Sequence, residues 1–296
     1  MQLWLEGAES LDFAKRADRV WKTSDHDVAV VQLDDFHGQD EAISLVGMID
    51  WILVRCSDWT MIPLENIVAA AAGSGTRIAA FVPNCIETVI LMLAATASGA
   101  IWTSCSPDFG SQGVIDRFGQ VEPSLLIVAN GYNYNGKTFG LEDKINGVLD
   151  KIDTIENVIS IKFAQVPCNL SHNSVIEYTD LLSDIADSPE FVQLPFDHPL
   201  YIMYSSGTTG PPKSIVHSAG GTLIQHLKEH QLQCDIQSGR DTLFWFTTCG
   251  WMMWNWLVSG LASGATIVLY DGSPAVSYTH LRAHETPEHR VIRRDR

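Results

Sequence analysis

Basic residues are scarce in this chain. Its 296 residues include 19 Lys and Arg against 35 Asp and Glu, which gives a formal net charge of −16 and a pI near 4.9. Nucleic acids and anionic membrane surfaces are bound by clustered Lys and Arg side chains. The composition therefore argues against either as the main partner, whereas a small anionic ligand held by local groups remains open.

Paired cysteines and a targeting segment are also missing. The six cysteines lack a Cys-x-x-Cys pair, and the first residues, MQLWLEGAES, lack the basic-then-apolar layout of a signal peptide. We therefore expect reduced thiols and a cytoplasmic location. Residues 241–271 carry no charge between their ends and are long enough to span a bilayer. Because Thr, Ser, Asn and Gly interrupt this stretch, no membrane span is expected, although a membrane-associated protein stays an alternative class.

Short β-branched or aromatic runs alternate with helical patterns along much of the chain. Residues 77–83 read as a strand, residues 85–99 as a buried helix closed by Gly99, and residues 100–105 as the next strand. Further strands are predicted at 124–130, 158–163, 199–204, 215–218, 242–248 and 265–272. This layout is typical of an α/β fold with mostly parallel sheets covered by helices. Residues 46–72 show no clean period and are helical, if at all, in their last third.

The composition changes after Pro274. Residues 275–296 hold five Arg, three His and three acidic residues and have no apolar period. We expect this segment to be a disordered or non-native tail and leave it out of the fold prediction. Residues 1–274 are expected to form the folded part.

The segment YSSGTTGPPK, residues 204–213, has the composition of a phosphate-binding loop. An apolar strand precedes it, and Gly207 and Gly210 allow backbone torsions that let amides converge on an anion. Four hydroxyl side chains and the mobile charge of Lys213 add further donors. The hydroxyls belong to Ser205, Ser206, Thr208 and Thr209.

A Walker A loop is the rival interpretation of this segment, because Gly207, Lys213 and Ser214 come within one residue of its spacing. A Walker lysine begins a helix, however, whereas Pro211 and Pro212 and the β-type run that follows favour an extended exit. The segment is therefore predicted to be strand–loop–strand. A Walker-type nucleotide-binding or hydrolysing protein remains the alternative function.

Across its whole length, YSSGTTGPPK resembles the phosphate loop of the AMP-forming acyl-CoA synthetase and adenylation superfamily. Residues 77–274 are similar to the acetoacetyl-CoA synthetase family within it, and residues 1–76 match more weakly. The resemblance implies a partial N-terminal adenylation domain that handles ATP, magnesium, acetoacetate and coenzyme A. The superfamily's later motifs have no counterpart here, so no catalytic residue is assigned and the chain is expected to be inactive alone.

The same resemblance assigns binding roles to particular positions. Ser205 to Gly210 and Lys213 are expected to hold the β- and γ-phosphates of ATP. The residues after Gly250 are expected to line the acyl pocket, with Met252 and Met253 in it and Trp251 as a wall. Helical spacing would place Trp251, Trp254 and Asn255 on one side, and most of the tryptophans are expected in the core. Lys137 is a candidate coenzyme A phosphate contact.

Three short segments resemble known motifs in part. HLKEH, residues 226–230, fits an inverted zinc-protease pattern, but a third ligand is missing, so it is interpreted as a polar helix face with no metal site. PDFG, residues 107–110, is interpreted as a turn after a strand, since no other kinase motif accompanies it. Asn135-Gly136 predicts a tight turn.

Overall fold

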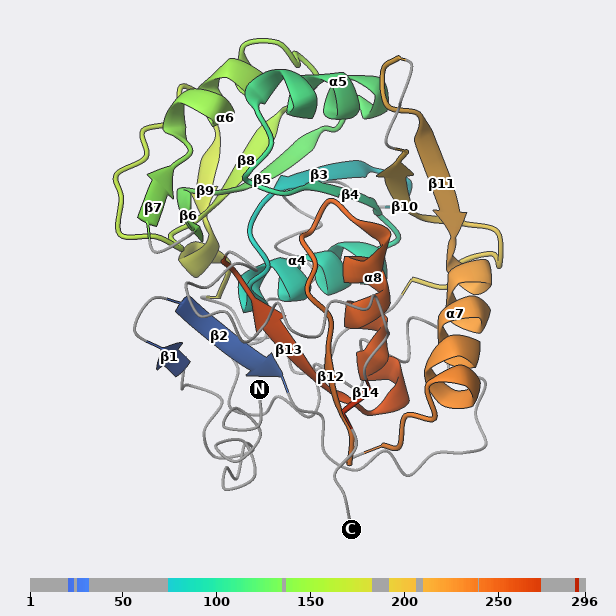
Figure 1. Cartoon of the computed structure of the whole chain (residues 1–296). Helices are drawn as coiled ribbons and strands as arrows, with labels where there is room; N and C mark the ends of the chain where they lie inside the picture. The colour runs from blue at the N-terminus through green and yellow to red at the C-terminus, as the bar shows by residue number, and fades with distance from the viewer. Residues whose placement is uncertain are drawn as a thin grey trace.

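The computed structural model describes residues 21–23, 26–31, 74–134, 137–182, 192–205, 210–238, 240–272 and 291–292 (Figure 1). For residues 21–31 and 291–292 the description concerns the backbone alone. The predictions for residues 46–72 lie outside these ranges. So does the predicted tail, apart from two residues.

A sheet of seven strands dominates the fold, in the order β11-β10-β4-β3-β5-β8-β9. Every neighbouring pair is parallel except β10 and β11, which are antiparallel. The strands are β3 (Arg77–Phe81), β4 (Ile101–Cys105), β5 (Leu125–Ala129), β8 (Asn157–Ile161), β9 (Val175–Glu177), β10 (Pro199–Tyr204) and β11 (Ser214–Ser218). The predicted α/β class with a mostly parallel sheet is confirmed.

Helices connect and cover the parallel strands. α4 (Ile86–Ala97) lies between β3 and β4 in the chain, α5 (Ser111–Val121) between β4 and β5, and α6 (Glu142–Leu149) between β5 and β8. Figure 1 shows α5 and α6 on one face of the sheet and α4 on the other. The predicted helix stop is also found, since Gly99 adopts a φ of +78° directly after α4.

Alternate residues of the central strands enter two different cores. In β3, Ile78 and Ala80 pack with α4, whereas Ala79 and Phe81 pack in the core that contains Phe118 of α5. All four side chains are buried. Burial on both faces explains why the central strands read as continuous apolar runs rather than as an alternating pattern.

A second sheet of five strands has the order β1-β2-β13-β12-β14. Its strands are β1 (Trp21–Thr23), β2 (His26–Val31), β12 (Thr242–Phe244), β13 (Thr266–Tyr270) and β14 (Val291–Ile292). α8 (Met252–Ser259) joins β12 to β13 through the 3-10 turn η4 (Gly260–Ser263). Leu91 of α4, Trp254 of α8 and Ile267 of β13 share one core, which ties this sheet to the first.

The uncharged stretch 241–271 is divided among β12, α8, η4 and β13. Among the described helices, none is both long and apolar enough to cross a bilayer. β12 ends at Phe244, earlier than the predicted 248, because the chain turns away to bring Cys249 against the ends of β3 and β4.

Smaller elements complete the described part. The hairpin β6 (Gly131–Tyr134) and β7 (Lys137–Gly140) is antiparallel, and Tyr134 pairs with Lys137. This pairing fits the turn predicted at Asn135-Gly136, which itself lies outside the described residues. The 3-10 turn η2 (Tyr178–Leu182) follows β9, and α7 (Ala219–Leu227) follows β11 and continues as the π-helix η3 (Lys228–Gln233).

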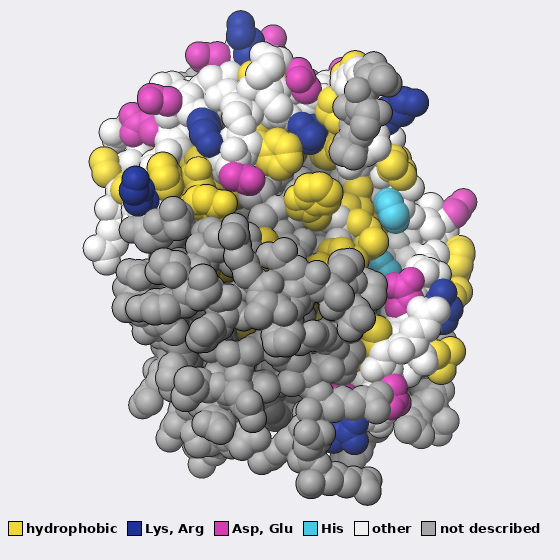
Figure 2. Space-filling view, in the orientation of Figure 1, with side chains coloured by type: hydrophobic (Ala, Val, Ile, Leu, Met, Phe, Trp, Pro, Cys, Tyr) yellow, Lys and Arg dark blue, Asp and Glu magenta, His cyan; other side chains and the backbone are white. Residues whose placement is uncertain are grey.

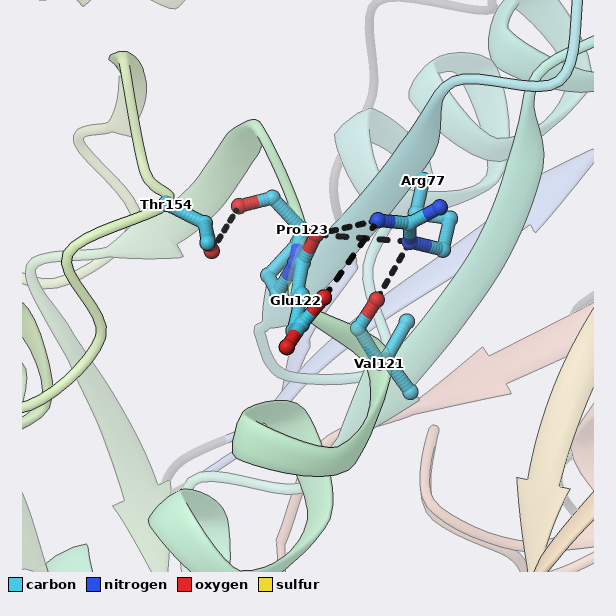
Figure 3. Close-up of polar contacts among 5 residues, drawn as sticks. All are labelled: Arg77, Val121, Glu122, Pro123 and Thr154. Atoms are coloured by element: carbon cyan, nitrogen blue, oxygen red, sulfur yellow. Dashed lines mark hydrogen bonds and ion pairs between the residues drawn. The ribbon is translucent and has the colours of Figure 1, made fainter.

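An arginine fixes the end of α5 to the start of β3. The Arg77 guanidinium donates hydrogen bonds to the carbonyls of Val121 and Glu122, with 3.1 Å between Nη2 and the Glu122 oxygen (Figure 3). Glu122 has a φ of +51°, the left-handed conformation that ends many helices. Thr154 donates to the carbonyl of Pro123 at 2.9 Å. The Arg77 bonds satisfy carbonyls that the end of a helix leaves without partners, and the Thr154 bond holds the residue that follows the C-cap.

Replacing Arg77 with Ala should lower the free energy of unfolding by about 1–2 kcal/mol, because charge-assisted hydrogen bonds to the end of α5 are lost. Urea unfolding followed by far-UV circular dichroism measures the change. Glu122→Gln is the matched control. It removes only the exposed 3.9 Å ion pair with Arg77 and should change stability by less than about 0.5 kcal/mol. Equal effects of the two changes would contradict a role for the carbonyl contacts.

Candidate functional site

The predicted phosphate loop connects two antiparallel strands. β10 pairs with β11 from Pro199 and Ser218 to Tyr204 and Ser214, so the chain reverses between Tyr204 and Ser214. The strand–loop–strand prediction is therefore confirmed. The Walker alternative is wrong, because β11 rather than a helix follows Lys213.

Two hydrogen bonds close the base of this loop. The Ser205 amide donates to the Lys213 carbonyl at 3.0 Å, and the Lys213 amide donates to the Ser205 hydroxyl at 3.2 Å. Gly210 and Lys213 are exposed. The structure thus brings Ser205 and Lys213 together, whereas Ser206, Gly207, Thr208 and Thr209 lie outside the described residues.

Helix α5 contacts the exit of the loop through a residue that the sequence interpretation missed. Gln120 donates from Nε2 to the carbonyl of Pro212 at 2.8 Å, and its Oε1 accepts a 3.2 Å hydrogen bond from the Ser214 hydroxyl. No short motif in the sequence marks this pairing, since 92 residues separate Gln120 from Pro212.

A second missed residue, Arg117, places a cation beside the start of the loop. Its guanidinium lies 4.4 Å from the ring centre of Phe109 and 5.8 Å from that of Tyr204, and it donates to the Gly113 carbonyl at 2.7 Å. Burial raises the pKa of Tyr204, whose hydroxyl accepts a 2.9 Å hydrogen bond from Thr103. The phenol is therefore neutral at physiological pH, and its ring can stack on the guanidinium.

The segment predicted to line the acyl pocket begins at the ends of β3 and β4. The Ser104 hydroxyl donates to the Cys249 carbonyl at 2.6 Å, and the Cys249 thiol donates to the Pro83 carbonyl at 3.2 Å. Burial raises the pKa of Cys249 well above its usual value, with the negative charge of Asp271 as a further cause. These contacts hold the turn that leads into α8.

The tryptophans of this segment divide between the core and the surface. Trp254 and Trp256 are 0% and 3% exposed, which confirms the core prediction for them. Trp251 and Met252 are 59% and 43% exposed, while Met253 is half-buried. The predicted shared side of Trp251 with Trp254 and Asn255 is not found. Trp251 has an extended backbone as the N-cap of α8, so helical spacing does not apply to it.

A small cavity lies between β4, β10 and the start of α8. Its lining comprises Trp102, Ser104, Tyr201, Ile202, Met203, Cys249, Gly250 and Asn255. Asn255 donates weakly to the Met203 sulfur at 3.7 Å, and within the described residues its Oδ1 has no hydrogen-bond partner. Trp251, Met252 and Met253 do not line this cavity. Lys137 belongs to the β6–β7 hairpin, where its side chain is exposed.

Comparison with known proteins identifies the fold family. The model of the AMP-binding enzyme family matches residues 67–291, about three quarters of the chain. The chain belongs to the AMP-binding enzyme family. A second model, the 3-dehydroquinate synthase II N-terminal domain, matches residues 5–94. The described part of that match comprises β1, β2, β3 and most of α4, and these strands are divided between the five-stranded sheet (β1, β2) and the seven-stranded sheet (β3).

The relatives of this AMP-binding chain described below are all named as CoA synthetases. Acetoacetyl-coenzyme A synthetase of Rhizobium meliloti is 52% identical over 211 residues, which cover 71% of this chain and 32% of that protein. Malonamoyl-CoA synthetase of Penicillium aethiopicum is 42% identical over 284 residues, which cover 92% of this chain and 38% of that protein. The solved structure of acetoacetyl-CoA synthetase from Streptomyces lividans is 44% identical in sequence and has a TM-score of 0.69. The match covers 73% of this chain and 33% of that one. The chain spans about a third of the length of these relatives.

The HLKEH segment of this AMP-binding chain is not a polar face, and that interpretation is corrected. His226 and His230 are both buried. Both contact the Ser259 hydroxyl, from His226 Nδ1 at 2.8 Å and from His230 Nε2 at 3.0 Å. The described residues contain no group of three or more metal-binding side chains, so no zinc site is found there.

The protonation of this histidine pair follows from its partners. Ser259 donates its hydroxyl proton to the Trp256 carbonyl at 2.8 Å, so its oxygen accepts from both rings. Within the described residues, His230 Nδ1 is buried without a partner, and a second proton there would be an unsatisfied donor. Burial accordingly lowers the pKa of His226 and of His230 to about 4. Both rings are neutral at physiological pH.

Stability should fall as the pH is lowered from about 6.5 to 4. The unfolded histidines take up protons near pH 6.5, whereas the folded ones resist protonation down to about pH 4. The loss at pH 4 should be on the order of 3 kcal/mol for each histidine, with almost no contribution above pH 7. Urea unfolding at several pH values measures it. The double change His226→Asn and His230→Gln should flatten this dependence, and an unchanged pH slope would contradict the assignment.

Proposed function

We propose that this chain carries the phosphate-binding part of an AMP-forming ligase that joins acetoacetate to coenzyme A. The observation that carries the proposal is the β10–loop–β11 arrangement, in which Ser205 and Lys213 close a Gly- and hydroxyl-rich loop. The 52% identity to acetoacetyl-coenzyme A synthetase of Rhizobium meliloti supports the choice of reaction.

In the proposed reaction, a carboxylate oxygen of acetoacetate attacks the α-phosphorus of ATP, and pyrophosphate leaves. The coenzyme A thiolate then attacks the acyl carbon of the adenylate, and AMP leaves. Ser205 to Gly210 would donate hydrogen bonds to the β- and γ-phosphates, and the ammonium group of Lys213 would stabilise the charge that collects on the departing pyrophosphate. These groups favour departure of pyrophosphate rather than transfer of a single phosphate.

Magnesium is expected as the partner of the ATP phosphates. Mg²⁺ keeps several waters and is commonly held by substrate phosphates with only one or two protein oxygens, so the hydroxyl-rich composition of the loop fits it without a dedicated acidic cage. When bound, the ion would neutralise part of the phosphate charge. The chain's own contribution is to orient the phosphates and to supply the Lys213 charge.

We place the acyl group near the start of α8. The exposed Trp251 and Met252 and the half-buried Met253 offer apolar contacts to a short chain at the end of the sheet where β3 and β4 terminate. The exposed ammonium of Lys137 would contact a phosphate of coenzyme A. The five described cysteines are all free thiols, which supports a cytoplasmic location.

The partners proposed are thus small molecules. On the face shown in Figure 2, Lys and Arg side chains of the described residues are scattered among Asp and Glu rather than gathered into one patch. On this face, the described residues therefore offer no extended basic surface for a nucleic acid backbone.

Acetoacetate and malonamate differ only in a terminal methyl or amino group. An amino group buried among Trp251, Met252 and Met253 would lose hydrogen bonds to water without replacement, which favours acetoacetate. The Penicillium relative keeps malonamate as the competing substrate to be tested. The assay uses a chimera in which residues 74–272 replace the matching segment of the Rhizobium meliloti protein, and follows pyrophosphate and AMP release. Phosphate release, or no acid-dependent release, would refute the proposed function.

In this chimera, Lys213→Ala should lower kcat/KM for ATP by about 5- to 150-fold, the effect of losing one charge-assisted contact of about 1–3 kcal/mol. Acetoacetate-dependent exchange of pyrophosphate into ATP measures the loss. Lys228→Ala is the control, because Lys228 is also exposed but lies in η3. If both variants exchanged at the wild-type rate, Lys213 would be a solvated loop residue.

A further inference from the structure

The Gln120 side chain contacts both residues that flank Lys213. Its Nε2 donates to the carbonyl of Pro212 at 2.8 Å, and its Oε1 accepts from the hydroxyl of Ser214 at 3.2 Å. Pro212 has no amide hydrogen and Ser214 begins β11, so these two bonds span the point where the loop becomes a strand. The amide group of Gln120 therefore brackets Lys213.

The opposite side of the same backbone is held by Ser205. The Lys213 amide donates to the Ser205 hydroxyl at 3.2 Å, and the Lys213 carbonyl accepts from the Ser205 amide at 3.0 Å. Together with Gln120, four hydrogen bonds surround one residue whose side chain stays exposed. The main chain is fixed while the ammonium group is left available.

Gln120 is itself oriented by its helix. Its Nε2 also donates to the Asp116 carbonyl at 2.6 Å, so both amide hydrogens and the amide oxygen are used. Arg77 ties the end of the same helix to β3, one residue beyond Gln120 (Figure 3). The Lys213 main chain is therefore connected, through Gln120 and the end of α5, to the central strand β3.

We infer that Gln120 is a positioning residue, which fixes the Lys213 main chain at the exit of the loop so that the ammonium group points toward the phosphates of a bound nucleotide. The inference rests on the proposed function for the identity of the ligand. This role requires the side-chain amide of Gln120. A carboxylate at position 120 is nearly the same size, but it would lose both N–H donors and repel the Pro212 carbonyl.

The first experiment measures amide hydrogen exchange in this chain without ligand, for Gln120→Ala, Gln120→Glu and the control Gln112→Ala. Gln112 is an exposed residue of the same helix, and it donates a 2.7 Å hydrogen bond to the Asp116 side chain. The amides of Ser205 and Lys213 should exchange about 5-fold faster in both Gln120 variants, as expected for losing roughly one hydrogen bond. They should be unchanged in Gln112→Ala. Unaltered exchange in the Gln120 variants would overturn the inference.

The second experiment asks whether Gln120 acts through Lys213. Binding of magnesium tripolyphosphate to this chain is measured by calorimetry for Gln120→Ala, Lys213→Ala and the double variant. Gln120→Ala should weaken binding about 5-fold in the wild type and less than about 2-fold when Lys213 is already Ala. Equal, additive effects would show that Gln120 contributes independently and would overturn the positioning role.

The two experiments separate the inference from the proposed function. If the wild-type chain does not bind magnesium tripolyphosphate, the phosphate-binding role of the loop fails. The exchange result still decides whether Gln120 fixes the Lys213 main chain. If binding is normal and exchange in the Gln120 variants is unaltered, the proposed function stands and the positioning inference fails.

Discussion

The parallel pairing of β3 with β4 and β5 is the constraint on which the rest of the structure depends. These strands are buried on both faces, by α4 on one side and by α5 and α6 on the other. Because parallel strands end at a common edge of the sheet, the segments that leave β3, β4 and β10 meet there. The loop after β10 and the Phe109 turn after β4 are neighbours for this reason. Cys249, which follows β12 of the other sheet, is held at the same edge by its hydrogen bonds with Ser104 and Pro83.

Helix α5 contacts both these strands and the residues at the base of the loop. Arg77 holds its end against β3, and Gln120 and Arg117 extend from it toward the residues around Ser205 and Lys213. A Gly-rich loop has high conformational freedom, and binding an anion requires part of that freedom to be lost. If the loop binds phosphate as proposed, contacts from a packed helix would reduce the conformational entropy that remains to be lost on binding.

Local patterns in the sequence predicted much of this fold. Apolar runs located six of the seven strands of the large sheet, and the two prolines before Lys213 distinguished a strand exit from a helical one. The short edge strand β9 was not predicted, because VIE is too short to form an apolar run. The roles of Gln120 and Arg77 could not be read in this way, since their partners lie 92 and 44 residues away and nothing in their local pattern marks them. His226 and His230 look polar in sequence, yet tertiary packing against Ser259 buries them. The exposure of Trp251 depends on where α8 begins, which spacing does not determine.

The Cys249 thiol has a chemical consequence for the proposed reaction. An acyl-adenylate is a strong acylating agent, and a protein thiolate beside it would capture the acyl group as a dead-end thioester. Cys249 lies two residues from Trp251, but it is buried, donates to the Pro83 carbonyl, and has a pKa raised well above its usual value. It is therefore not nucleophilic at neutral pH. In the proposed reaction, self-acylation at this position would therefore be suppressed, and the coenzyme thiol would have no sulfur competitor in Cys249.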